Sequence, residues 1–201
     1  HLHTHSVHKY TNMSSGGVEI HAATDDRVPD IVNINNKFLS SKHALCCIPL
    51  SCQTAKLQRG VFSSCPDKMN VGGLAVDEES GEALGYCQLS FKGMPTELHT
   101  MKEGECYVEW LAVLPEARGK GVGTKLLKWA EETARSRKSS YMTLGVIRGN
   151  PAIRLYERDG FATIQEDCEE EFFGCCLVTF LFGRPYGCCA LGWGALTMKK
   201  P

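Results

Sequence analysis

A stripe of small and aliphatic residues recurs with a helical period after residue 121. It consists of Gly123, Leu126, Leu127, Ala130 and Ala134. Charged side chains take the opposite positions: Lys125, Lys128, Glu131, Glu132 and Arg135. Because an apolar stripe backed by charges is typical of a helix that packs one face on a core, the pattern predicts an amphipathic helix from Gly121.

Runs rich in strand-forming residues surround this helix. They predict strands at 17–23, 69–76, 83–91, 106–114 and 141–147. The segment 77–82 is polar and contains a glycine, so the second and third strands should form a hairpin. The last two strands are connected through the helix, and such a crossover places them parallel and side by side with a right-handed connection.

Three further helices and a final strand pair complete the pattern. An N-cap cluster at 24–26 precedes a helix with apolar positions at Val28, Ile31, Val32, Phe38 and Leu39. A second helical segment is expected at 50–61, and Asn150 with Pro151 starts a short helix that Gly160 ends. The turn at 183–187 separates two apolar runs, 175–182 and 188–198, which we expect to pair antiparallel.

The length and the ends of the chain indicate one domain. The 201 residues can bury a full core without a linker, so we place the domain at 17–201. Residues 1–16 hold four of the seven histidines and lack the apolar core of a signal peptide; we expect a disordered tail there, with Met13 as the natural start. The longest apolar run, 175–182, is far shorter than the roughly 18 residues of a membrane-spanning helix, so no transmembrane segment is expected.

Charge and cysteine content narrow the classes of function. With 22 basic and 23 acidic side chains the net charge is -1, which gives no reason to expect a nucleic-acid partner. The 11 cysteines include three adjacent pairs but no Cys-x-x-Cys spacing. Neighbouring cysteines rarely meet disulfide geometry, and the spacing of a zinc site is missing. We therefore predict small buried thiols in a cytoplasmic protein, and no metal site.

A glycine-rich segment, Arg118-Gly119-Lys120-Gly121-Val122-Gly123, opens the predicted helix. Its glycines leave the backbone free to adopt positive φ and let a ligand approach amide groups at the positive end of the helix dipole. The turn therefore suits a phosphate or pyrophosphate group. Its spacing excludes a P-loop, and the third glycine comes one residue too soon for the dinucleotide-binding fingerprint. A glycine-rich helix start without a ligand is the remaining alternative.

Two separated segments resemble the GNAT superfamily of acyl-CoA-dependent N-acetyltransferases. The signature of that family is Arg or Gln, two residues, Gly, one residue, then Gly or Ala, and Arg118, Gly121 and Gly123 match it. The stretch 111–115 looks like the strand before the signature, and 150–161 looks like the downstream motif. The resemblance implies a single-domain α/β (α+β) fold, with a mixed, mostly antiparallel sheet, a parallel central strand pair and flanking helices.

The resemblance also implies where a coenzyme binds. Acetyl-CoA would be the co-substrate, with its pyrophosphate on the amides of Arg118, Gly119, Lys120, Gly121, Val122, Gly123 and Thr124. In the family a bulge or splay in the preceding strand exposes backbone groups to the pantetheine arm and the acetyl carbonyl, and an N–H there stabilises the oxyanion. Leu111, Ala112 and Val113 occupy that strand here. Asn150 is an N-cap by its chemistry and a coenzyme contact by the resemblance.

Candidates for proton transfer come from the same comparison. Related enzymes place acidic or histidine bases at the position of Glu109 or two residues earlier, which is Tyr107 here. Glu109 is our first choice, because an amine with a pKa of about 10.4 is mostly protonated at neutral pH and needs a base. Alternation puts both side chains on one face unless a bulge shifts the parity. An exposed strand residue without a role is the equal alternative, and His99 and Glu105 are weaker candidates.

The acceptor is less well defined by the sequence. Tyr156 matches the motif tyrosine near the coenzyme sulfur, where it would donate a hydrogen bond, with plain packing as the alternative. Amino-terminal acetyltransferases often carry a glutamate where Gly145 stands, which weakens that assignment. We predict direct acetyl transfer, in a ternary complex, to a primary amine of a small molecule, a lysine or a protein N-terminus. The alternative function is an inactive acetyl-CoA sensor. If the expected strand pair formed by 175–182 and 188–198 is exposed, a contact in a homodimer is one candidate role for that pair.

Overall fold

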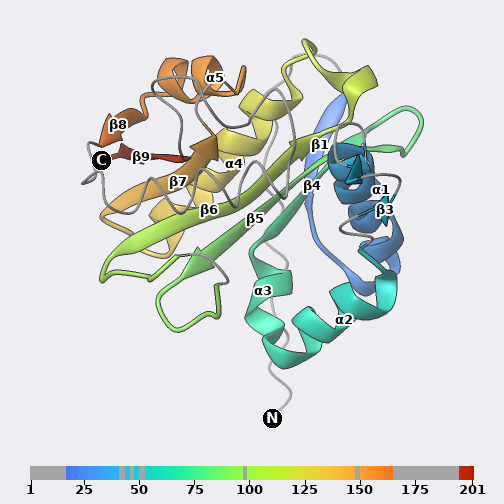
Figure 1. The fold of residues 1–201 in the computed structure, drawn as a ribbon, viewed down its shortest axis with the longest axis horizontal. Helices are drawn as coiled ribbons and strands as arrows, with labels where there is room; N and C mark the ends of the chain where they lie inside the picture. The colour runs from blue at the N-terminus through green and yellow to red at the C-terminus, as the bar shows by residue number, and fades with distance from the viewer. Residues whose placement is uncertain are drawn as a thin grey trace.

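A seven-stranded sheet runs through the molecule and carries helices on both of its faces (Figure 1). The structure is a computed structural model that describes residues 17–40, 44–45, 48–49, 53–96, 99–147, 150–164 and 195–201. The strands of this sheet are β1 Val18–Ala22, β4 Gly72–Asp77, β5 Ala83–Phe91, β6 Glu105–Val113, β7 Tyr141–Ile147, β8 Ala162–Ile164 and β9 Ala195–Lys200. Their order is β1-β4-β5-β6-β7-β9-β8, and β2 Ala44–Leu45 pairs separately with β3 Ile48–Pro49.

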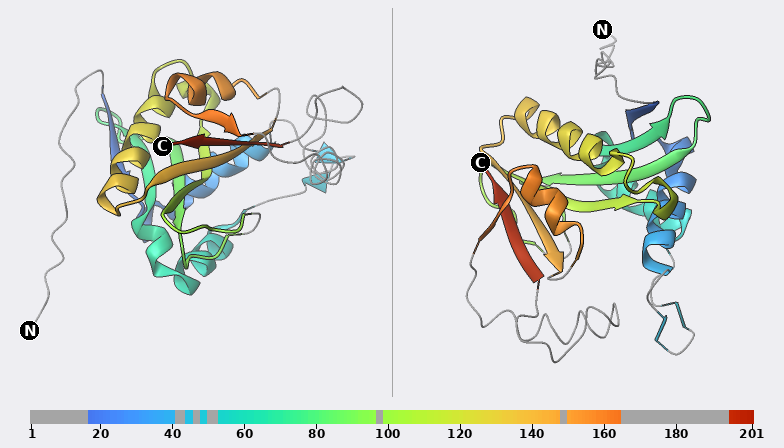
Figure 2. Two further views of the ribbon diagram at one scale, coloured as in Figure 1. Left: turned by 90° about the vertical axis from the view of Figure 1, so that its left-hand side faces the viewer. Right: turned by 90° about the horizontal axis from the view of Figure 1, so that it is seen from above.

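The helices divide between the two faces of the sheet. Their bounds are η1 Asp25–Arg27, α1 Val28–Ser40, α2 Ala55–Ser64, α3 Pro66–Asn70, η2 Pro115–Ala117, α4 Val122–Ser136 and α5 Ile153–Arg158. A Cβ on Gly85 of β5 would meet Val122 and Leu126, so this position faces α4. Its neighbour Tyr86 points to the other face, because successive strand residues alternate. Figure 2 shows α4 on one side of the sheet and α1, α2 and α3 on the other.

The strand pairing confirms the predicted mixed sheet. β6 and β7 are parallel, with Glu105 opposite Tyr141 and Val108 opposite Leu144, and α4 forms the crossover between them. The described pairs β1·β4, β4·β5, β5·β6, β7·β9 and β8·β9 are antiparallel. β4 and β5 form the predicted hairpin, so the local hydrophobic patterns indicated the central strands correctly.

The segment before this hairpin differs from the prediction. We predicted a strand at 69–76, but helix α3 continues to Asn70 and β4 begins only at Gly72. Pro66 lies in the first turn of α3, where its fixed φ suits a helix and its missing N–H is not needed. The proline therefore starts a second helix directly after α2, and this helix takes the beginning of the expected strand.

The second predicted helix also begins later than expected. We placed it at 50–61, whereas α2 starts at Ala55. The hydroxyl of Thr54 accepts a hydrogen bond from the Leu57 N–H at 3.2 Å, so a side-chain cap fixes the start of the helix. The sequence contained this signal, because threonine is among the preferred N-cap residues.

The C-terminal strand pairs within the main sheet. Part of the predicted run 188–198 forms β9, which continues to Lys200 and lies between β7 and β8. Its expected partner, 175–182, lies outside the described residues, as do the tail at 1–16 and the three adjacent cysteine pairs. Cys65, Cys87 and Cys106 are free thiols.

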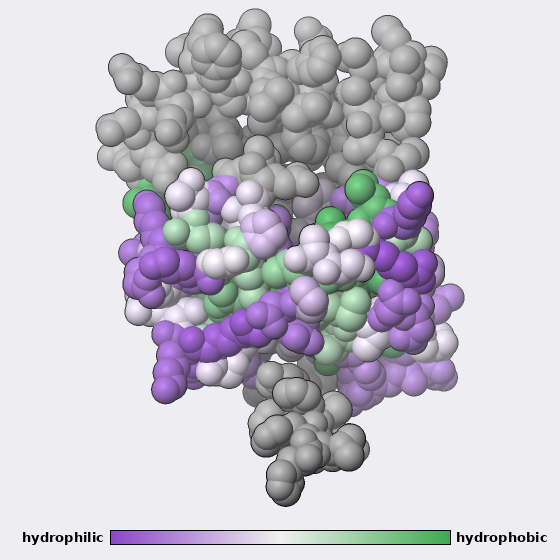
Figure 3. Space-filling view, turned by 90° about the horizontal axis from the view of Figure 1, so that it is seen from below, coloured by the Kyte–Doolittle hydropathy of each residue, from purple (hydrophilic) through white to green (hydrophobic). Residues whose placement is uncertain are grey.

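The surface near α2 exposes apolar side chains. Leu57 and Val61, one helical turn apart on α2, are 60% and 39% exposed. Figure 3 views the end of the molecule at which α2 and α3 lie in Figure 1, and apolar residues there form a patch bordered by hydrophilic ones. Among the helices that the structure describes, none is long and apolar enough to cross a membrane.

Candidate functional site

A β-bulge interrupts β6 at Glu109. Gln88 of β5 lies opposite Trp110, but the next residue, Leu89, lies opposite Val108. Glu109 is therefore the extra residue of the bulge and has no partner across the β5 ladder. Because a bulge re-aims a side chain while the flanking pairs stay in place, it is a common device at functional sites.

The parallel strands β6 and β7 separate at the same point. Their register runs from Glu105 opposite Tyr141 to Val108 opposite Leu144 and ends there, although β7 continues to Ile147 against β9. Within the described residues, the stretch 110–113 therefore pairs with β5 and not with β7. At 111–113, no strand among the described residues pairs with the side of β6 that faces away from β5.

The bulge decides which side chains share a face. Tyr107 lies opposite Ser90, and Glu109 accepts a hydrogen bond from the same Ser90, so both point to the face of α3 as predicted. Past the bulge the parity changes, and Leu111 and Val113 lie opposite Cys87 and Gly85 on the α4 face. Any coenzyme contact of 111–113 on the splayed side would therefore use the backbone more than these two side chains.

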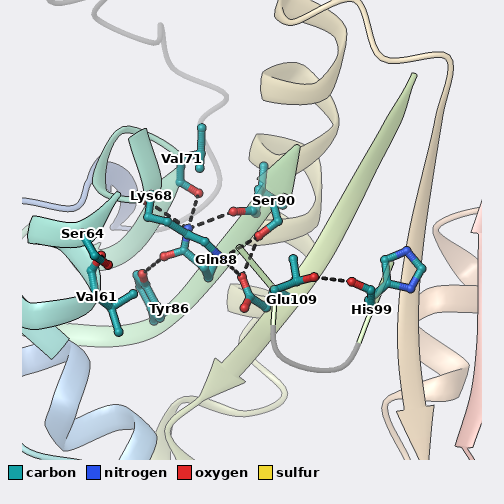
Figure 4. Close-up of polar contacts among 11 residues, drawn as sticks. Val61, Ser64, Lys68, Val71, Tyr86, Gln88, Ser90, His99 and Glu109 are labelled. Carbon is teal, nitrogen blue, oxygen red and sulfur yellow. Dashed lines mark hydrogen bonds and ion pairs between the residues drawn. The ribbon is translucent and has the colours of Figure 1, made fainter. Parts of the chain in front are cut away.

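Glu109 is held by a buried lysine. The Ser90 hydroxyl donates to Glu109 Oε2 at 2.6 Å, and the Lys68 ammonium forms an ion pair with the same oxygen. Lys68 Nζ also donates to Ser90 Oγ at 2.8 Å, which closes a triangle of polar contacts (Figure 4). The Lys68 side chain is 3% exposed and that of Glu109 25% exposed, so the carboxylate borders solvent while its partner is buried.

The lysine is fixed in turn by β5. Gln88 Nε2 donates to the Lys68 carbonyl at 2.9 Å, and the Tyr86 hydroxyl donates to Gln88 Oε1 (Figure 4). Burial raises the pKa of Tyr86, so its hydroxyl stays a donor. Neither Lys68 nor Ser90 was predicted as a site residue. No local pattern indicates them, because Lys68 lies 41 residues from Glu109 in the sequence, just before the segment that was predicted as a strand.

A second polar cluster surrounds Glu105 at the start of β6. Its carboxylate accepts from the Thr143 hydroxyl and, at 2.7 Å, from the Lys102 N–H, and His99 Nε2 lies 2.9 Å from Oε1. Burial opposes the charge of Glu105, but these hydrogen bonds outweigh it and lower its pKa. The His99 ring stacks on Tyr107 with 4.2 Å between ring centroids. The two weaker base candidates, His99 and Glu105, are thus engaged with each other.

The glycine turn has the conformation that the sequence predicted. Gly119 and Gly121 have φ of 77° and 80°, a region that favours glycine, and a Cβ on either would meet nothing within 4 Å. The first amide after the turn with a backbone acceptor is Lys125 N–H, which donates to Gly121 O at 3.0 Å. The N–H groups of 119–124 have no acceptor among the described residues, so a nest of donors opens to solvent at the start of α4.

Two residues of this turn, Gly123 and Arg118, make contacts with other parts of the protein. Gly123 lies inside α4 without a positive φ, and a Cβ there would come 2.9 Å from Leu155 Cδ2, so this glycine brings α4 close to α5. Arg118 Nε donates to Val113 O at 3.3 Å and ties the turn back to β6. The expected positive φ is therefore confirmed at the first two glycines and wrong at the third.

Tyr156 lies on the other side of the sheet from Lys68. Tyr156, on α5, is 7% exposed, and its pKa is raised by burial and by the nearby Cys87 thiol. Because Cys87 lies on the α4 face of β5, Tyr156 and Glu109 approach the splayed strands from opposite faces. Asn150 Oδ1 accepts from the Ala152 N–H at 2.9 Å, but α5 begins at Ile153 and its N-cap is Ala152, so the predicted N-cap position was wrong by two residues.

Comparison with known proteins agrees with this geometry. Residues 44–161 match the model of the acetyltransferase (GNAT) family. The chain is 36% identical over 89 residues to S-(2-succino)cysteine N-acetyltransferase of Bacillus subtilis, covering 43% of this chain and 52% of that protein. It is 40% identical over 84 residues to aminoalkylphosphonate N-acetyltransferase of Salmonella typhimurium, covering 41% and 51%. The chain spans about half the length of the curated relatives it matches.

Solved structures show the same fold. A GCN5-related N-acetyltransferase from Kribbella flavida gives a TM-score of 0.65 at 19% identity, covering 92% of this chain and 98% of that one. The paia N-acetyltransferase from Thermoplasma acidophilum, solved in complex with coenzyme A, gives 0.62 at 14% identity, covering 94% and 99%. These likenesses confirm the predicted mixed sheet with flanking helices.

Proposed function

Because the chain belongs to the GNAT family of acetyltransferases, we propose that it transfers an acetyl group from acetyl-CoA directly to a primary amine in a ternary complex. The candidate acceptors are a small-molecule amine, a lysine or a protein N-terminus. The two relatives named above are called N-acetyltransferases of small amines, which favours the first class. The observation that carries the proposal is the bulge at Glu109, which puts a carboxylate beside the point where β6 and β7 separate.

The glycine turn is the proposed site for the pyrophosphate of the coenzyme. The amides of 119–124 lack acceptors in the described part of the chain, and nothing fills the space above Gly119 and Gly121. Arg118 adds positive charge next to these donors. The backbone of 111–113, which has no β7 partner among the described residues, would pair with the pantetheine arm next to the Val113 carbonyl that accepts from Arg118. Asn150 would contact the coenzyme from the start of the α5 segment.

Acetyl-CoA supplies a thioester, and the chain supplies the groups that move protons around it. Glu109 is proposed as the base that takes a proton from the amine, directly or through water, so that a neutral nitrogen attacks the carbonyl carbon. Tyr156 is proposed to hydrogen-bond the sulfur that leaves, and burial keeps its hydroxyl protonated. Tyr107, beside Glu109 on the same face, is proposed to line the acceptor pocket and is the second choice for a proton-transfer role.

Substitution of Glu109 and Tyr156 tests these roles. We expect Glu109→Gln to lower kcat by about 10²-fold or more, the usual contribution of a general base, and to leave the acetyl-CoA Kd unchanged. Tyr156→Phe should lower kcat less, because a hydrogen bond to the leaving sulfur is lost while the ring remains. Free thiol release with a panel of amines measures turnover, and calorimetry measures coenzyme binding.

Glu103→Gln is the matched control, because this glutamate is 83% exposed and lies two residues before β6. Wild-type turnover in Glu109→Gln would overturn the proposed base. An inactive sensor is the competing function, and it would bind acetyl-CoA tightly without releasing thiol in the presence of any amine. The free thiols of the described residues fit the cytoplasmic location that we also propose.

A further inference from the structure

Lys68 carries a charge in a position where an unpaired charge would be costly. Its side chain is 3% exposed, and the two groups that compensate its ammonium are Ser90 Oγ, at 2.8 Å, and Glu109 Oε2. Its backbone is fixed as well, since the Lys68 carbonyl accepts from Gln88 Nε2. The lysine is thus held from β5 at both ends, and its ammonium is directed at the bulge of β6.

The two oxygens of Glu109 differ in their surroundings. Oε2 receives both the Ser90 hydroxyl and the Lys68 ammonium. Oε1 has no hydrogen-bond donor within the part of the chain that the structure describes, and the side chain is 25% exposed. One oxygen is therefore saturated by the protein, and the other can accept a proton or a hydrogen bond from outside.

We propose that Lys68 is a positioning residue for acetyl transfer: together with Ser90 it holds Oε2 of Glu109, so that the carboxylate presents Oε1 to the acceptor amine. This inference rests on the proposed role of Glu109 as the base. A bulged residue lacks the ladder contacts that fix its neighbours, so its side chain needs another anchor. The ion pair with Lys68 provides that anchor.

The test compares kcat and the KM for the amine between Lys68→Met and the wild type. Methionine fills much of the buried volume without a charge, and it leaves Glu109 without the ion pair that holds Oε2. We expect kcat to fall about tenfold and the KM for the amine to stay within about twofold, because the carboxylate is misplaced while the rest of the acceptor site is kept. The acetyl-CoA Kd should stay unchanged, because the glycine turn lies on other elements.

Lys92→Met is the matched control. Lys92 forms an ion pair with Glu103 near the same strands, but its side chain is 60% exposed, so its removal should change neither kcat nor KM. If Lys68→Met does not fold by thermal melting, Ser90→Ala replaces it, because it removes one donor to Oε2 and keeps the lysine. That variant should also lower kcat, but by less than about tenfold.

A double variant separates positioning from plain structural support. If Lys68 acts through Glu109, then Lys68→Met together with Glu109→Gln should be no slower than Glu109→Gln alone. A slow Glu109→Gln with wild-type kcat in folded Lys68→Met, or in Ser90→Ala, would overturn this inference and leave the proposed base intact. Full activity of Glu109→Gln would instead overturn the proposed base, and a multiplicative loss in the double variant would reassign Lys68 to structural support.

Discussion

Glu105 and Glu109 lie on the same strand, and both accept hydrogen bonds from side chains of a neighbouring strand. Glu105 uses both oxygens, with Thr143 and His99 at Oε1 and the Lys102 N–H at Oε2, and its side chain is 1% exposed. Glu109 uses only Oε2 within the described residues and is 25% exposed. The comparison teaches that two carboxylates on one strand can differ in hydrogen-bond saturation: one has both oxygens engaged by the protein, and the other keeps an oxygen that can accept a hydrogen bond from outside the described residues.

Replacing Glu105 should give the largest effect on stability. Glu105→Gln keeps the shape but loses the charge, and its amide group faces donors such as the Thr143 hydroxyl and the Lys102 N–H. We expect the free energy of unfolding to fall by about 2 to 3 kcal/mol, measured by urea denaturation, with kcat at 25 °C within a fewfold of wild type. Glu103→Gln, at a highly exposed site, should leave the denaturation midpoint in place. An unchanged midpoint in Glu105→Gln would remove the distinction between the two carboxylates.

A smaller loss is expected when one donor to Glu105 is removed. Thr143→Val keeps a β-branched side chain in β7 but deletes the hydroxyl that donates to Oε1. The other two contacts of the carboxylate remain, so we expect a loss of about 1 kcal/mol in the free energy of unfolding. Thr163→Val on the exposed strand β8 is the control. Equal denaturation curves for the two valine variants would show that Glu105 does not depend on this bond.

The pH dependence of stability gives the most subtle comparison. The folded state lowers the pKa of Glu105 below its ordinary 4.5, because the hydrogen bonds to the charged form outweigh burial. This contribution to stability is present above the unfolded pKa and is lost as the pH falls through the folded pKa. As the pH is lowered below 4.5, the midpoint of urea denaturation should therefore fall more steeply in the wild type than in Glu105→Gln. Parallel curves would contradict the assignment.

Local signals account for the parts of the site that the sequence predicted. Gly119 and Gly121 need a conformation that other residues avoid, and the stripe of α4 follows directly, so adjacent residues were enough to place the turn. The parallel pairing of β6 and β7 could be predicted because the connection between them is a crossover that contains helix α4. The motif from Asn150 to Phe161 likewise lies within one continuous segment.

Non-local contacts account for what the sequence did not predict. Glu109 and Lys68 meet only because α3 packs beside β5, and a buried lysine runs against the general rule that such side chains are exposed. The bulge depends on the register with β5, which the alternation of β6 alone does not reveal. For the same reason the partners of Glu105 could not be assigned, because Thr143 reaches it from another strand.

The bulge also bears on how this strand tolerates change during evolution. Val108 and Trp110 already lie opposite consecutive residues of β5, so the ladder would close without Glu109 and no neighbouring side chain would switch faces. The proposed base is thus an insertion in an otherwise regular strand, and loss of that one codon would leave the sheet intact. Within this strand, catalysis and architecture can be gained or lost separately.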